Sequence, residues 1–119
     1  MTIQDVYTEL QGDFEDARKR LMNEPMVIRF ALKFSADPSM QQLRDAVEAE
    51  DIESSFRAAH TLKSVAGVLG FTRLFAVSVA LTEQLRPRLY PADKALLAAV
   101  EEEYDRTIAV LKKFEAERL

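Results

Sequence analysis

Apolar residues recur at intervals of three and four along almost the whole of this 119-residue sequence. That spacing gives each helix one apolar stripe, whereas a strand needs alternation at every second residue, and no segment alternates for long enough. The sequence therefore predicts an all-α fold. Because single stripes must be buried against one another, we expect an antiparallel four-helix bundle with additional short N-terminal helices.

Residues that favour helix ends divide the chain into segments. Expected helix starts are marked by Asp13, Asn23, Asp37 with Pro38, Asp51, Thr72 and Pro91. Expected ends are marked by Gly12 and Gly70, and Pro87 predicts a stop or kink. We interpret residues 1–119 as a single domain, with the bundle itself over about residues 20–118.

Composition and charge restrict the classes of function. No apolar run approaches the ~20 residues needed to span a membrane, and the start MTIQDVYTEL lacks the features of a signal peptide. We therefore expect a cytoplasmic protein that does not bind membranes. The 20 acidic residues outnumber the 16 basic ones, which argues against nucleic-acid binding, and the absence of cysteine excludes disulfides.

The only histidine of the chain, His60, begins the stretch HTLKSVAGVLG. At 100° per residue, one arc of this helix is expected to face the core, and it carries Ser55, Ala59, Leu62, Ala66 and Leu69. His60 then points outward. The residues stacked with it on the outer face are Arg57, Lys63, Ser64 and Gly67. Gly67 costs about 1 kcal/mol relative to alanine inside a helix, a cost that makes sense if a partner must approach this surface.

An outward imidazole beside a lysine suits the acceptance of a phosphoryl group. The ring nitrogen of His60 is the expected nucleophile, and Lys63 is expected to neutralise the charge of the phosphate. Arg57 and Arg73 are expected to extend this cationic region and attract the phosphoryl end of a partner, with ordinary solvated charge as the alternative. Val68 and Phe71 are candidates for the apolar part of a docking patch, with a core position as the alternative for Phe71.

The segment AHTLKSVAGVLG resembles the signature of the histidine-containing phosphotransfer (HPt) domain, commonly written H-x-L-K-G-x-x-x-x-x-G. Four positions match it as they stand, namely His60, Leu62, Lys63 and Gly70, while Ser64 stands where the family usually has glycine. The segment RFALKFSADPSMQQLRDAV is similar to the pair of helices that precede this motif in the family.

The resemblance implies a phosphorelay protein with the four-helix bundle expected above. His60 would take a phosphoryl group from the aspartate of a receiver domain, in a response regulator or a hybrid histidine kinase, and pass it to another receiver. The Mg²⁺ belongs to the receiver, so we expect no cofactor or metal in this chain. The residues expected to dock the receiver are Arg57, Ser64, Gly67, Val68 and Phe71. The initial methionine and the complete bundle favour a free-standing protein, and we expect it to be a monomer.

Other functions remain as alternatives. The main one is a degenerate HPt bundle that binds a receiver or kinase without phosphotransfer because Ser64 crowds the partner. Three glycines and no G-x-x-x-x-G-K-[ST] motif argue against an ATP-binding kinase, and Ser64 beside His60 lacks the acid and oxyanion hole that hydrolysis requires. The run from Glu101 to Glu103 is typical of a solvated helix face rather than a metal site.

Overall fold

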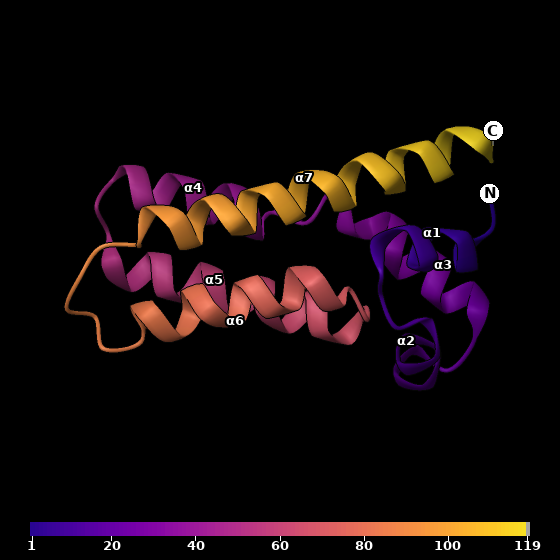
Figure 1. Cartoon of the computed structure of the whole chain (residues 1–119), viewed down its shortest axis with the longest axis horizontal. Coiled ribbons are helices and arrows are strands. Elements are labelled where there is room, and N and C mark those ends of the chain that lie inside the picture. The colour runs from indigo at the N-terminus through magenta and orange to yellow at the C-terminus, as the bar shows by residue number, and fades with distance from the viewer. Residues whose placement is uncertain (119) are drawn as a thin grey trace.

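The computed structural model describes residues 1–118, which form seven helices and no strand. The helices are α1 (Ile3–Leu10), α2 (Phe14–Leu21), α3 (Glu24–Phe34), α4 (Ser39–Glu48), α5 (Ile52–Val68), α6 (Thr72–Leu85) and α7 (Lys94–Glu117) (Figure 1). The all-α prediction is confirmed. Leu119, the last residue of the predicted domain, lies outside the described residues. None of the seven helices has the length and apolar content needed to cross a membrane.

Helices α4 to α7 form the four-helix bundle. Consecutive helices pack against each other and run in alternating directions, as Figure 1 shows. Helices α4 and α7 are also in contact. Arg44 on α4 forms an ion pair with Asp105 on α7 at 3.6 Å, and its guanidinium lies over the ring of Tyr104. Each helix contributes fully buried side chains to the shared core, including Leu43, Leu62, Leu81 and Leu111. The antiparallel bundle expected from the sequence is therefore present.

The three N-terminal helices cover one end of this bundle. Helix α1 lies along the C-terminal part of α7, where Arg106 donates a hydrogen bond to the carbonyl of Glu9 at 2.6 Å. Helix α2 packs against α3 and α5. In Figure 1 these helices lie at the end of the bundle where α5 finishes and α6 begins. They consequently surround the end of the segment that carries the HPt-like motif.

Phe71 belongs to the core at this end of the bundle, so its placement in a docking patch was wrong. Its side chain is 2% exposed and packs against the rings of Tyr7 and Phe34, with centroids 5.6 Å and 5.5 Å away. The Tyr7 hydroxyl also donates a hydrogen bond of 2.6 Å to the carbonyl of Leu69. The apolar and polar parts of Tyr7 together attach α1 to the connection between α5 and α6.

Most helix starts follow the predicted caps. The side chains of Asp13, Asn23 and Asp51 each accept a hydrogen bond from the backbone N–H three residues later, which satisfies one of the free donors of a first turn. At the start of α4, the Asp37 carboxylate accepts from the N–H of Ser39 at 2.9 Å. Local capping chemistry therefore predicted these four boundaries.

Two helix starts differ from the predictions. Thr72 does not cap α6 but is its first residue, and its hydroxyl donates back to the carbonyl of Gly70 at 3.3 Å. Helix α7 begins at Lys94 rather than at Pro91, because the side chain of Asp93 accepts from the N–H of Leu96 and provides the cap. Helix α6 does end before Pro87, as expected.

Candidate functional site

Helix α5 places His60 on its outer surface. All five residues predicted to form the inner arc are buried, namely Ser55, Ala59, Leu62, Ala66 and Leu69, whereas His60 is exposed. A helix whose inner arc is fixed in the core presents its opposite residues to solvent at defined positions. The predicted orientation of the histidine is therefore confirmed.

The neighbours of His60 on its own helix leave the ring accessible. Its imidazole packs against the ring of Phe56, one turn earlier, with centroids 5.9 Å apart. Ser64, one turn later, donates its hydroxyl hydrogen to the backbone carbonyl of His60 at 3.0 Å. The Ser64 hydroxyl is thus directed back to the helix backbone, a geometry that keeps this side chain close to the helix surface.

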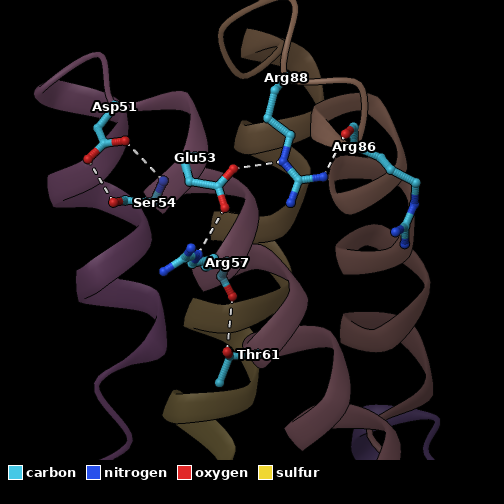
Figure 2. Close-up of polar contacts among 7 residues, drawn as sticks. All are labelled: Asp51, Glu53, Ser54, Arg57, Thr61, Arg86 and Arg88. Carbon is cyan, nitrogen blue, oxygen red and sulfur yellow. Dashed lines mark hydrogen bonds and ion pairs between the residues drawn. The ribbon is translucent and has the colours of Figure 1, made fainter.

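A network of ion pairs surrounds the first turns of α5 (Figure 2). Glu53 accepts hydrogen bonds from Arg57 and Arg88, each at 2.9 Å, and Arg88 also donates to the carbonyl of Arg86 at 2.8 Å. These hydrogen bonds, first from Arg88 and then from Arg57, lower the pKa of Glu53 below its usual value. The network joins the connection after α6 to the start of α5.

Phe56 links this network to the histidine. The guanidinium carbons of Arg88 and Arg86 lie 3.6 Å and 5.3 Å from the centroid of its ring, on which the His60 imidazole also packs. Cations are attracted to the face of an aromatic ring. Neither arginine was among the predicted site residues, because both follow His60 by more than 20 residues and no local pattern connects them to it.

The cations predicted to surround His60 are only partly together. Lys63 and Arg57 lie on α5 within one turn of the histidine, and Arg57 is paired with Glu53. Arg73 is elsewhere, because it is ion-paired with Glu103 on α7 at 2.7 Å and donates to the Gln11 side chain, also at 2.7 Å. The prediction that Arg73 extends the cationic region around His60 was therefore wrong.

The prediction that the acidic run on α7 is a solvated helix face is wrong for Glu103. It is buried and accepts from Arg73 and Arg106, so it is an internal ion-pair partner rather than part of a solvated face. Within residues 1–118, no three or more His, Cys, Asp or Glu side chains are grouped closely enough to hold a metal ion.

From His60 toward the C-terminal end of α5, the exposed surface of this helix lies between two grooves. Ser64 and Val68 line both grooves, and Val68 is 43% exposed. One groove, of about 400 Å³, is mainly apolar and is lined among others by Leu21, Phe30, Phe34, Val65 and Leu69. The other, of about 420 Å³, is more polar and includes Arg20, Lys63 and Phe75. The surface next to the histidine therefore combines exposed apolar groups with charges.

Gly67 makes room for an aromatic ring from the neighbouring helix. A Cβ atom at this position would lie 3.2 Å from both Cδ1 and Cε1 of Phe75 on α6. Phe75 is 38% exposed and was not among the predicted site residues. The glycine thus permits close packing of α6 against α5 on the same face as His60, and Phe75 adds to the apolar surface beside Val68.

We expect Gly67→Ala to stabilise the fold by less than about 1 kcal/mol, the difference in helix propensity, because Phe75 must shift slightly to admit the methyl group. Urea unfolding of the two proteins measures this difference. A loss of more than about 2 kcal/mol would mean that Phe75 cannot move and that the site is as tightly packed as an internal one.

The fold and the site together define a helical bundle with its single histidine exposed on the outer surface of α5. The family model for the Hpt domain matches residues 30–110, from within α3 to within α7, which is more than half of the chain. The chain therefore belongs to the Hpt domain family, and its function is related to phosphotransfer in two-component signalling. Domains of this family interact with receiver domains and kinases. The searches of curated proteins and of solved structures gave no match.

Proposed function

We propose that this chain is a phosphorelay intermediate that carries a phosphoryl group on His60 between the aspartates of two receiver domains. The observation that supports this most strongly is the exposure of the only histidine, at the middle of α5 in an Hpt-family bundle. Lys63, one turn further along α5, adds a positive charge on the same part of the surface.

In the first transfer, the lone pair of an imidazole nitrogen attacks the phosphorus of the receiver's phosphoaspartate. A P–N bond forms while the P–O bond to the carboxylate breaks, and the carboxylate leaves with the electron pair. The proton on the other ring nitrogen stays, so the imidazole becomes a phosphorylated imidazolium. The second transfer is the reverse reaction with another aspartate. The receiver's Mg²⁺ supplies most of the charge stabilisation, and this chain supplies the nucleophile and its position.

The surface around His60 suits the docking of a receiver. Val68 and Phe75 provide exposed apolar area beside Gly67, and the apolar groove continues this area toward α3. Arg57 and Ser64 lie on the same outer face of α5. The Ser64 hydroxyl bonds to the helix backbone, which favours an accessible histidine over the degenerate alternative in which Ser64 crowds the partner.

The proposal is tested by incubating the chain with phosphorylated receiver domains in turn. We expect at least one receiver to transfer a label that is acid-labile and alkali-stable, as a phosphohistidine is. Binding of receivers without any such label would instead support the degenerate binding module. Both outcomes are read from the same samples, by labelling and by a binding measurement.

We expect Lys63→Ala to slow transfer to His60, or to shorten the lifetime of the phosphorylated form, without unfolding the bundle. A charge-assisted contact with phosphate contributes about 1.5–3 kcal/mol, so the effect should be about tenfold or more. Time courses of labelling and decay measure it, and circular dichroism checks the fold. Equal rates for the two proteins in both directions would remove Lys63 from the site.

A further inference from the structure

The packing of α5 against α6 determines which residue of α6 lies beside His60. The space above Gly67 is filled by the ring of Phe75 on α6, and Phe56 packs against Arg86, the residue that directly follows α6. Eleven residues backward along α5 therefore correspond to eleven residues forward along α6 and its continuation. Because the two helices are antiparallel, this register places His60 opposite residue 82. Thr82 itself is fully buried, so its exposed neighbour Glu83 is the group of α6 that reaches the surface beside the histidine.

Glu83 is fully engaged by one arginine. Its two carboxylate oxygens accept hydrogen bonds from the Nε and Nη2 atoms of Arg86, each at 2.9 Å. The hydrogen bond from Arg86 lowers the pKa of Glu83, with smaller contributions from the charges of Arg86, Lys63 and His60. Because both of its oxygens are bound to Arg86, Glu83 can act on the histidine only through its charge.

The position of Arg86 is fixed from two sides. Its backbone carbonyl accepts a hydrogen bond from Arg88, which is itself bound to Glu53 (Figure 2). Its guanidinium lies over the ring of Phe56, on which the imidazole of His60 packs. The charge of Arg86 is consequently held one aromatic ring away from the proposed phosphorylation site.

We propose that Arg86 is a second cation for the phosphoryl group on His60, and that Glu83 neutralises Arg86 while His60 is unphosphorylated. This inference rests on the proposed function. Phosphorylation of His60 adds net negative charge beside the pair, which repels Glu83 and attracts Arg86. The Glu83–Arg86 pair then sets how far the transfer equilibrium lies toward the phosphorylated chain, because Arg86 attracts the phosphoryl group and Glu83 repels it.

The test measures the equilibrium constant for phosphoryl transfer between one labelled receiver and the chain. Glu83→Gln frees Arg86 and should shift the equilibrium toward the phosphorylated chain by about two- to fivefold, the range for an exposed charge interaction. Arg86→Gln frees Glu83 and should shift it by a similar factor in the opposite direction. The double variant should return close to the parent value, and the shifts should shrink in high salt.

A pair on α2 provides a matched control. Arg18 donates from Nε and Nη2 to Glu15 at 3.1 Å and 3.0 Å, with the same spacing along the helix as Arg86 and Glu83. Glu15→Gln and Arg18→Gln should leave the equilibrium unchanged. Equilibrium shifts of the same sign for the Glu83 and Arg86 variants, or equilibrium constants equal to those of the controls, would overturn this inference alone. A parent chain that no receiver labels would overturn the proposed function as well.

Discussion

The His60→Gln protein is expected to accept no phosphoryl group from any receiver while remaining folded. Glutamine lacks the nucleophilic ring nitrogen, and His60 is the only histidine of the chain. The His60 side chain is exposed on α5, and Phe56 is the aromatic ring against which it packs. Because glutamine is a good helix former, the substitution should change the free energy of unfolding by less than about 1 kcal/mol. Labelling and urea unfolding of the same preparations measure the two effects.

Arg18→Gln is a suitable control for this experiment, because it also places glutamine on an exposed helix surface but lies on α2. It should be labelled as the parent is. Label that persists on the His60→Gln protein would place the phosphorylation site on another residue. A stability loss of more than about 2 kcal/mol would show that His60 supports the core.

Gly70→Ala is expected to destabilise the fold by about 2–4 kcal/mol, because two separate costs combine at this position. The first cost is conformational. Gly70 has a φ of 67° and ends α5 in the left-handed conformation, which lets Phe71 donate to the carbonyl of Ala66 at 3.0 Å and turn into the core. An alanine in this conformation is strained.

The second cost is steric. A Cβ atom on Gly70 would collide with the backbone carbonyl of Asp13, and the Asp13 N–H donates to the Gly70 carbonyl at 2.8 Å. Because both partners are backbone, neither moves easily. A Cβ on Gly12 would likewise lie 2.6 Å from the Gly70 carbonyl. Two glycines thus allow the linker between α1 and α2 to cross the end of the HPt-like motif.

Gly67→Ala is the matched control, because it makes the same chemical change on the same helix, where only the exposed Phe75 ring must move. Urea unfolding should separate the two variants by several kcal/mol, with Gly70→Ala the less stable. Equal stability of the two proteins would contradict the role assigned to the crossing at Gly70.

The sequence predicted those features of the fold that depend on local chemistry. Asp13, Asn23 and Asp51 cap helices because a short acceptor side chain reaches the N–H three residues later, and this requires no knowledge of the tertiary structure. The orientation of His60 followed from the apolar arc of a single helix. The class of fold and the central residue of the candidate site were therefore accessible from periodicity and motif spacing.

The remaining features depend on contacts between distant segments. Phe75 and Arg86 reach the site through the register of α6 against α5, which no single-helix pattern specifies. Phe71 follows a helix-ending glycine, where an exposed position is ordinary, but the turn at Gly70 directs its ring against Tyr7 and Phe34. Side-chain pairing across the bundle, unlike capping, could not be predicted from sequence spacing.

The most direct test of phosphoryl transport by His60 uses two receivers. One receiver is phosphorylated with labelled phosphate and freed of its donor, and a second, unlabelled receiver is then added with or without this chain. We expect label to appear first on the chain in an acid-labile form and then on the second receiver, only when His60 is present. Transfer to the second receiver at the same rate without the chain, or with the His60→Gln protein, would contradict a relay through His60.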